Sequence, residues 1–342
     1  MKLNRIFIFN LAIFLIALTT FSSCQSDKLQ FYRLSGPTMG TIYNIKFIAP
    51  QGYNELKLKK DVEIRLDEVN KAMSTYISDS EISLFNKMSK DEKFFPGKDF
   101  KRTLEHALDV AKKTDGTFDP TIGTLVNLWG FGPNGKRKIP SQSDVLAAKE
   151  KVGYEKIKLD GNTLTKSVDG VYLDLSASAK GYGVDALIEL LKSQGIRNAL
   201  VEVGGEVRTM GESLTRPWKI GVESPSNKDG NPVVRVVTMK DVALATSGDY
   251  RNFFKEGGKR YQHTINFKSG APVASQLASV SVVSDTCMDA DAWATALMAM
   301  GKEKAIAYAK KNKLKAFFIY RSDDGSGKYL ETSTEEFDKI TK

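Results

Sequence analysis

Apolar and polar residues alternate over residues 41 to 49, TIYNIKFIA, and this period of two predicts a β-strand. A helical period follows the strand after a short turn. Its apolar positions, three or four residues apart, are Val62, Leu66, Val69 and Met73. The largely polar residues 74 to 86 are expected to form a loop. A second helix is predicted from about residue 102 to 113, with Leu104, Leu108 and Ala111 on one face.

The middle of the chain switches between turn signals and regular periods. Residues 117 to 135 are rich in glycine, proline and aromatic residues, which favours a structured loop or a short helix between loops. A hairpin with its turn at Asp160-Gly161 is followed by a predicted strand at residues 170 to 176. An amphipathic helix is then predicted from residue 177 to its C-cap at Gly195.

Short strands separated by glycine-rich loops fill much of the second half. They are predicted at residues 198–205, 217–224, 233–239, 241–248 and 277–285. An apolar helix at residues 287 to 300 ends at Gly301. A helix at residues 302 to 313, a strand at residues 315 to 321 and a polar tail complete the pattern.

This order of elements predicts the fold class. The body of the chain contains no internal repeat, low-complexity tract or Pro/Ser linker. We therefore expect residues 36 to 340 to form a single large α+β domain, with helices packed on a mostly antiparallel sheet.

The N-terminus is typical of a secretory signal peptide, residues 1 to 23. Lys2 and Arg5 precede an apolar run from residue 6 to 21. Asn10 interrupts this run, which is also short for a membrane span.

A pair of serines directly before Cys24 resembles a bacterial lipobox, in which the cysteine is acylated and becomes the mature N-terminus. Phe21 stands where a leucine is usual, so ordinary signal cleavage is the alternative. Acylation of Cys24 would anchor the protein to a membrane face, with residues 24 to 35 as a polar tether. The only other cysteine, Cys287, is then expected to be a small buried apolar residue without a disulfide.

The net charge of the chain indicates which classes of binding partner are expected. The formal net charge is +9, and removal of Lys2 and Arg5 with the signal peptide leaves +7. No block of basic residues and no interleaving of basic and aromatic residues accompanies this surplus, so nucleic acid is not predicted as a partner. An anionic small molecule or a membrane surface fits better.

The residue inventory excludes several kinds of site. The two histidines, His106 and His263, are too few for a multi-histidine zinc or iron centre, and no cysteine cluster replaces them. The G-x-S-x-G and Walker A motifs are absent from the sequence. Oxygen atoms are the ligands that remain, and they suit a hard cation such as Mg²⁺.

Two polar residues of the apolar helix at 287 to 300 are candidate ligands for such a cation. Asp291 and Thr295 lie four residues apart and therefore on one face. They would supply two oxygens, and the rest of the shell would come from a backbone carbonyl, water and ligand phosphate. The alternative is that Asp291 is bonded within a polar patch while Thr295 bonds back to its own helix.

A histidine is the side chain best suited to take a proton near neutral pH. His106 lies two residues from Leu104 of the apolar stripe, and we expect it on a solvated helix face. His263 lies in the stretch YQHTINF beside the glycine-containing KSGAP. The residues alone leave open whether His263 is a general base or a structural histidine.

Five motifs carry a family resemblance. DADAWATALMAMG, DLSASAKGYGVD, FDPTIGTLVNLWGFGP, TSGDYRNFF and HTINFKSGAPV resemble the ApbE family of FAD:protein FMN transferases, whose members are often lipoproteins. The resemblance covers roughly Thr38 to Gly301. It implies an enzyme that cuts the FAD pyrophosphate with Mg²⁺ and links FMN to a Thr or Ser hydroxyl of a partner protein, releasing AMP. FAD is then a substrate rather than a redox cofactor.

The resemblance also implies site residues. The metal ligands fall on Asp291, Thr295 and the backbone carbonyl of Ala177, and the catalytic base falls on His263. The FAD contacts fall on Met39, Tyr76, Thr117, Phe118, Asp119, Asp174, Lys180 and Ile265. The implied partner is the acceptor flavoprotein subunit of a membrane redox complex. The implied location is the periplasmic side of a bacterial membrane.

Several of these contacts have a physical interpretation. Tyr76 and Phe118 offer flat faces on which flavin or adenine can stack. The carboxylates of Asp119 and Asp174 would accept from N–H groups. Lys180, at the start of a helix, suits phosphate. The alternatives are that Tyr76 is a core aromatic residue and Lys180 a solvated side chain.

The sequence departs from the family pattern after His263. Asn266 and Phe267 stand where an acidic residue and a proline are usual, and Glu206 stands where aspartate is common. Three competing hypotheses therefore remain. They are an FAD pyrophosphatase in which water replaces the hydroxyl, a flavin-binding lipoprotein without turnover, and a structural lipoprotein without flavin.

Overall fold

The computed structural model describes residues 28–133, 135–214, 216–225, 233–250, 252–324 and 326–341. Within these residues the backbone forms an eight-stranded sheet in the order β1-β2-β5-β6-β9-β14-β15-β16. The strands are β1 (Leu29–Thr38), β2 (Thr41–Pro50), β5 (Asn198–Val203), β6 (Glu206–Met210), β9 (Ala243–Gly248), β14 (Leu277–Ser284), β15 (Lys315–Arg321) and β16 (Tyr329–Ser333). Every neighbouring pair is antiparallel, which confirms the predicted α+β class.

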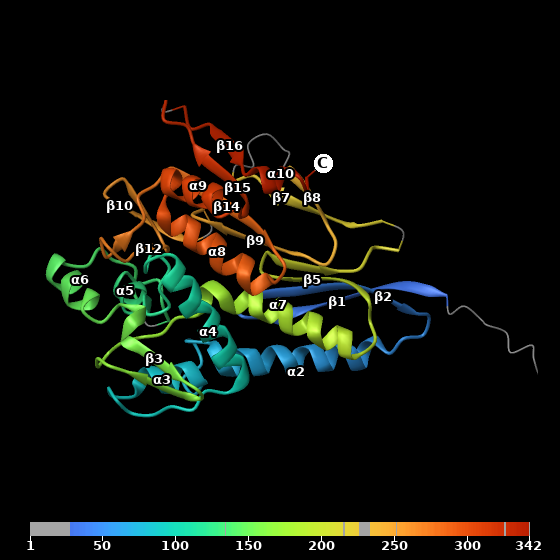
Figure 1. Ribbon diagram of the computed structural model, residues 1–342, viewed down its shortest axis with the longest axis horizontal. Coiled ribbons are helices and arrows are strands. Elements are labelled where there is room, and N and C mark those ends of the chain that lie inside the picture. Colours follow the sequence, from blue (N-terminus) through green and yellow to red (C-terminus); the bar gives the residue numbers. More distant parts are fainter. Residues whose placement is uncertain are drawn as a thin grey trace, which may run out of the picture.

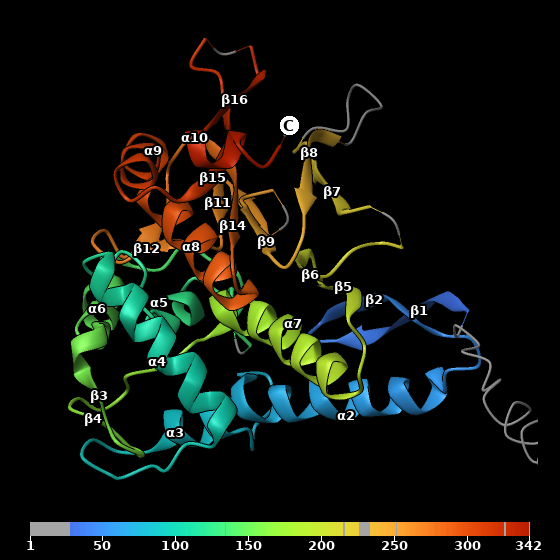
Figure 2. The ribbon, with the colours of Figure 1, turned by 45° about the vertical axis from the view of Figure 1, so that its right-hand side comes forward.

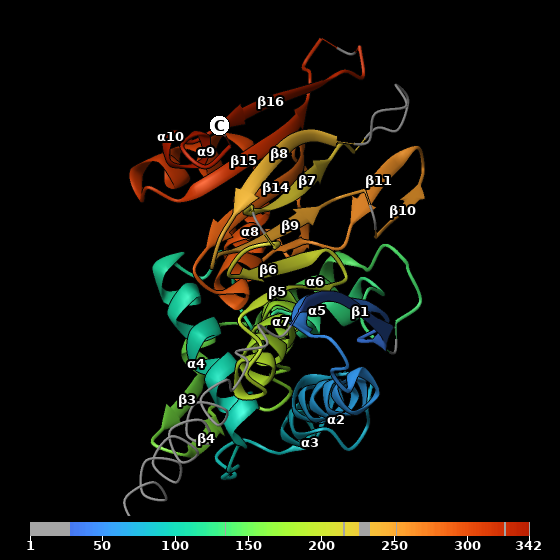
Figure 3. The ribbon, with the colours of Figure 1, turned by 90° about the vertical axis from the view of Figure 1, so that its right-hand side faces the viewer.

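Helices cover one face of this sheet (Figure 1). They are α2 (Glu55–Met73), α4 (Lys98–Lys113), α7 (Ser176–Ser193), α8 (Cys287–Met300) and α9 (Lys302–Lys311). Figure 2 shows α2, α4 and α7 next to one another, and Figure 3 looks along α2 with β1 above it. Alternate residues of β5, such as Val201, face this layer and pack with Val184 and Leu187 of α7.

The opposite face of the sheet has its own core. Leu200, the neighbour of Val201 in β5, points to this side and packs with Trp218 and Phe337. Trp218 belongs to the hairpin of β7 (Trp218–Glu223) and β8 (Val233–Met239), and Phe337 to α10 (Glu335–Asp338). Because both faces are covered, the central strand β14 is buried along nearly its whole length.

A smaller apolar cluster stands beside the sheet. It joins α5 (Gly123–Leu128) and α6 (Gln142–Lys149) to the hairpins β10 (Phe253–Glu256) with β11 (Lys259–Gln262) and β12 (Ile265–Asn266) with β13 (Ala271–Pro272). Trp129 ties these parts together because its Nε1 donates to the carbonyl of Gly270 at 2.8 Å. Short helix α5 agrees with the prediction of a short helix between loops in residues 117 to 135.

The structure corrects the prediction of a loop at residues 74 to 86. This stretch contains the first six of the seven residues of α3 (Glu81–Lys87), whose N-cap Ser80 accepts from the amide of Ser83. Two turns are too short to show a helical period, so only the cap signalled the helix.

The predicted strand at residues 170 to 176 is also wrong. Beyond one isolated bridge between Ile122 and Tyr172, this stretch forms no ladder. The side chain of Asn86 takes the place of a neighbouring strand, because it accepts from the amide of Leu173 at 2.7 Å and donates to its carbonyl at 2.9 Å. The predicted hairpin before it is confirmed as β3 (Ile157–Asp160) and β4 (Thr163–Lys166).

The ends of the domain extend beyond the expected elements. Strand β1 begins at Leu29 and so includes part of the stretch expected as a tether, while β16 and α10 form within the expected polar tail. The predicted signal peptide and Cys24 lie outside the described residues. Among the residues that are described, no helix has the length and apolar character that a membrane crossing requires.

Candidate active site

Helices α7 and α8 run antiparallel in close contact. Gly181 of α7 permits this contact, because a Cβ there would lie 2.3 Å from the carbonyl oxygen of Cys287. The amide of Gly181 donates to Oδ2 of Asp291 at 3.1 Å, so the buried acid of α8 is bonded to the backbone of α7. Ala177, one turn before Gly181, faces the cavity together with Thr295, one turn after Asp291.

We expect Gly181→Ala to lower the free energy of unfolding by about 1–3 kcal/mol, because the backbone of α8 would have to move. The measurement is thermal unfolding. Gly183→Ala is the matched control on the same helix, since the nearest atom there is the terminal methyl of Met39, 2.8 Å from the built Cβ, on a flexible side chain. Equal stability of both variants would contradict the tight helix contact.

One cavity of about 390 Å³ gathers most of the predicted site residues. It is lined by Tyr76, Thr117, Phe118, Asp119, Asp174, Ala177, Lys180, His263, Ile265, Asp291 and Thr295. Met39 does not line it and instead packs among the apolar side chains between α2 and α7. A more open hollow of about 650 Å³ between α2, α4 and α7 contains none of the predicted residues.

A charge cluster of two buried carboxyl groups and the partly exposed Lys180 lies at one wall of the cavity. The Nζ atom of Lys180 lies 3.2 Å from Oε1 of Glu206 and 3.8 Å from Oδ2 of Asp291. Burial raises the pKa of Glu206 to about 8, and burial also raises the pKa of Asp291. Burial alone would lower the pKa of Lys180, but the two carboxylates outweigh it and raise that pKa. The hypothesis of a freely solvated Lys180 is therefore wrong.

The residues at this wall fit a hard cation. Two carboxyl groups face one ammonium group, and Oε2 of Glu206 is buried without a hydrogen-bond partner among the described residues. Thr295 Oγ1 lies 2.9 Å from the hydroxyl of Ser247 on β9 rather than bonding only to its own helix. Carboxylate, hydroxyl and carbonyl oxygens are the donors that Mg²⁺ prefers. No group of three or more His, Cys, Asp or Glu residues suited to a metal occurs in the described part of the chain, so a cation here would need the mixed set.

His263 faces the same cavity from the loop before β12. Its Nδ1 lies 3.2 Å from the carbonyl oxygen of Asn252, an acceptor that fixes Nδ1 as the protonated nitrogen and Nε2 as the basic one. Burial lowers the pKa of His263 below the usual 6.5, and the hydrogen bond to Asn252 opposes this only in part. The imidazole is therefore neutral at pH 7, as a general base must be.

The two aromatic candidates differ in exposure. Tyr76 is 72% exposed at the mouth of the cavity, which leaves its ring open to a stacking partner and excludes the core alternative. Phe118 is only 6% exposed and packs in the main core. Little of the Phe118 ring is therefore open to a planar ligand.

Two further aspartates that line the cavity, Asp119 and Asp174, organise their own loops. Asp119 accepts from the amide and hydroxyl of Thr121 and from the amide of Tyr154, and burial raises its pKa to about 6. Asp174 accepts from the amide and hydroxyl of Ser176 at the start of α7. Through these hydrogen bonds, both carboxylates fix the backbone of the cavity wall.

His106 does not lie on a solvated helix face, contrary to the prediction. Its Nε2 lies 3.0 Å from Oδ1 of Asp289, and its Nδ1 is buried without a partner among the described residues. The apolar stripe of α4 identifies one buried face, but α8 packs across a second face that the stripe cannot reveal. His106 therefore contacts α8 through the side chain of Asp289.

The departures after His263 leave an ordered turn. Oδ1 of Asn266 accepts from the amide of Ser269 at 3.0 Å, and this bond supports the β12–β13 hairpin. Phe267 is half-buried against the small apolar cluster.

Sequence reasoning missed Ser247 and Asn252 as neighbours of Thr295 and His263, although both lie within the quoted motif TSGDYRNFF.

The antiparallel sheet, the α7–α8 pair and the cavity at its end define an α+β protein with the architecture of solved flavin transferases. The flavin transferase ApbE from Vibrio cholerae superposes with a TM-score of 0.84 at 40% identity, over 91% of this chain and 99% of that one. The apo flavinyl transferase ApbE of Pseudomonas stutzeri gives a TM-score of 0.84 at 35% identity, over 92% and 97% of the chains.

The sequence comparisons agree with the structural ones. The FAD:protein FMN transferase of Vibrio cholerae serotype O1 is 41% identical over 96% of this chain and 98% of that protein. The FAD:protein FMN transferase of Haemophilus influenzae is 38% identical over 94% of each. The ApbE family model matches residues 39–318. This chain belongs to the ApbE family.

Proposed function

We propose that the protein transfers FMN from FAD to a Thr or Ser hydroxyl of a partner protein in a Mg²⁺-dependent reaction that releases AMP. The names of the relatives support the transfer of FMN from FAD to protein. The observation that carries the proposal for this chain is one cavity lined both by the Asp291–Lys180–Glu206 charge cluster and by the neutral imidazole of His263. Phosphoryl transfer requires charge neutralisation and a base at one site.

In this mechanism Lys180 attracts the pyrophosphate of FAD, and Tyr76 stacks on a ring system at the cavity mouth. Asp291, Thr295 and the carbonyl of Ala177 would hold Mg²⁺, which when bound supplies positive charge to the phosphate oxygens. Nε2 of His263 takes the proton of the attacking hydroxyl. A bond forms between that oxygen and the FMN phosphorus, and the bond from this phosphorus to the bridging oxygen breaks. AMP leaves with the bridging oxygen.

The decisive experiment incubates the purified chain with FAD, Mg²⁺ and a candidate acceptor flavoprotein subunit. We expect a covalently fluorescent acceptor band and one AMP released per FMN attached. Free FMN with AMP and no labelled acceptor would instead identify a pyrophosphatase. Tight FAD binding with neither product would identify a flavin-binding protein without turnover, and no FAD binding would leave a structural role.

The rate of transfer should fall in acid at a pH set by the pKa of His263. Because burial lowers the pKa of this imidazole, we expect kcat/KM to be constant near neutral pH and to fall only below the usual value of 6.5. The measurement is kcat/KM for the acceptor between pH 5 and 8, a range that brackets ordinary histidine titration. An acid limb centred above 6.5 would contradict a neutral, buried base.

We also propose that acylated Cys24 holds the enzyme on the periplasmic side of a bacterial membrane, where the acceptor subunit of a membrane redox complex is modified. The lipobox-like sequence before Cys24 supports this proposal. Cys24→Ala should move the protein from the membrane fraction to the soluble fraction and abolish palmitate labelling. Labelling that persists in the variant would contradict the assignment.

A further inference from the structure

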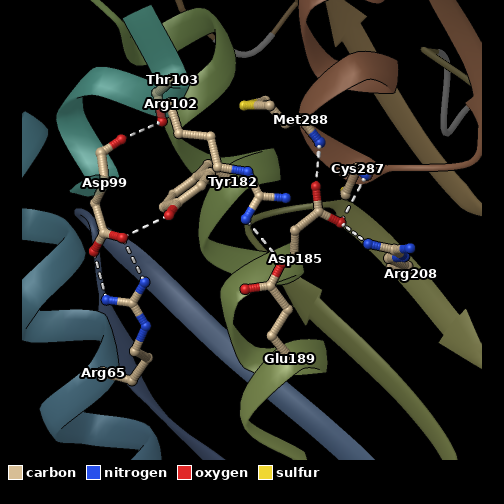
Figure 4. Close-up of polar contacts among 10 residues, drawn as sticks. All are labelled: Arg65, Asp99, Arg102, Thr103, Tyr182, Asp185, Glu189, Arg208, Cys287 and Met288. Atoms are coloured by element: carbon tan, nitrogen blue, oxygen red, sulfur yellow. Dashed lines mark hydrogen bonds and ion pairs between the residues drawn. The ribbon is translucent and has the colours of Figure 1, made fainter. Parts of the chain in front are cut away.

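The first turn of α8 is bound by a carboxylate from another helix (Figure 4). Oδ1 of Asp185 on α7 accepts from the amide of Cys287, and Oδ2 accepts from the amide of Met288, both at 2.9 Å. These are the first two residues of α8, whose amides have no partner within the helix. The side chain of the N-cap residue, Thr286, accepts from the amide of Asp289. Asp185 accepts from the amides of Cys287 and Met288, which Thr286 does not bind.

Arg208 holds Asp185 from the sheet side. Its Nη1 donates to Oδ1 of Asp185 at 2.6 Å, and the side chain of Asp185 is only 3% exposed. Arg208 lies two residues after Glu206 in β6, so both side chains point from the same face of the strand toward α7. Every oxygen of Asp185 therefore has a buried partner.

Two polar clusters thus join α7, α8 and β6, one helical turn apart. The cluster at the cavity contains Lys180, Glu206 and Asp291 and has an oxygen without a partner. The second cluster contains Asp185, Arg208 and the first amides of α8. Asp185 follows Gly181 by four residues and Asp291 follows Cys287 by four, so the second cluster fixes the register in which α8 meets α7.

We propose that Asp185, clamped by Arg208, is a positioning residue that sets where α8 presents Asp291 and Thr295 to the cation and the pyrophosphate. This inference rests on the proposed function. Asp185 does not line the cavity, and it contacts α8 through the amides of Cys287 and Met288. If the first turn of α8 is released, Asp291 loses its fixed distance from Gly181 and from Lys180.

The test compares Asp185→Asn and Arg208→Met with the full wild-type chain. The probe is Mn²⁺, titrated with and without FAD and followed by electron paramagnetic resonance. We expect Asp185→Asn to weaken Mn²⁺ binding by about tenfold or more, because the amide offers one acceptor oxygen where the carboxylate offers two. Arg208→Met keeps the carboxylate but frees it, and a smaller loss of about threefold to tenfold is expected.

The matched control removes a buried contact on the other face of the sheet. Phe337→Ala deletes a ring that is fully buried and stacked on Phe317, so it should lower the melting temperature while leaving Mn²⁺ affinity within about twofold. Mn²⁺ binding by Asp185→Asn that matches the wild type, or that is no weaker than in Phe337→Ala, would overturn the proposal. If Asp185→Asn does not fold, Arg208→Met decides by the same criterion.

The outcomes for the two proposals are distinguishable. A wild-type chain that binds FAD and Mn²⁺ but leaves every acceptor unlabelled would end the transferase proposal, whereas the Mn²⁺ comparison would still decide the role of Asp185. A wild-type chain without any Mn²⁺ binding would overturn the positioning proposal together with the metal site.

Discussion

Asp291→Asn is expected to lower the rate of FMN transfer by about 10³-fold or more. Asp291 is buried beside Lys180 and Glu206 and is the one carboxylate that α8 contributes to the cavity wall. The neutral amide of the asparagine would keep the shape of the site but would offer a cation much less negative charge than the carboxylate of Asp291. Initial rates at saturating FAD and at increasing Mg²⁺ concentrations measure the loss.

The fold should survive this change. Burial raises the pKa of Asp291, so the charged carboxylate costs free energy in the ligand-free protein, and its removal is expected to leave the melting temperature unchanged or higher. Asp289→Asn is the matched control on the same helix, because Asp289 bonds His106 and Ser284 outside the cavity. That variant should lose stability while keeping most of its rate. Equal loss of rate in both variants would contradict the assignment of Asp291.

His263→Gln is expected to lower kcat by about 10²–10⁴-fold. Glutamine can still donate to the carbonyl of Asn252, so the loop keeps its anchor, but it cannot take a proton from the attacking hydroxyl. FAD affinity, measured by flavin fluorescence, should change little. The residual rate should no longer fall on acidification through the range in which imidazole titrates, and single-turnover kinetics across pH measure this directly.

The second histidine supplies the control. His106 contacts Asp289 and lies outside the cavity, so His106→Gln should change the melting temperature more than kcat. A loss of rate in His106→Gln as large as that in His263→Gln would show that the first turn of α8, rather than a base, limits the reaction.

The periods of apolar residues predicted the elements that are long or amphipathic. The strand at residues 41 to 49, the helix through Leu187 and the apolar helix after residue 286 all formed near the expected bounds. The same periods gave wrong elements where a side chain, rather than a neighbouring strand or helical turn, makes the hydrogen bonds to the backbone. Asn86 replaces a strand partner for Leu173, and a serine cap starts α3, and neither interaction has a period that a sequence can display.

The candidate site was predictable to a similar degree. The spacing of Asp291 and Thr295 indicated a shared face, and the cavity contains both. The same spacing could not reveal that Lys180 and Glu206 complete the charge cluster, because these residues come from another helix and from a strand. The position of Met39 within the apolar layer was equally hidden, since a methionine suits either environment.

Strand β1 begins at Leu29, only five peptide units after Cys24. With a lipid on Cys24, as proposed, the folded body would stand no more than about 17 Å from the bilayer surface, the full contour length of that connection. An enzyme held by so short a connection could not diffuse into the surrounding solution. Its acceptors would therefore have to reach the membrane surface themselves, as the subunits of a membrane complex do.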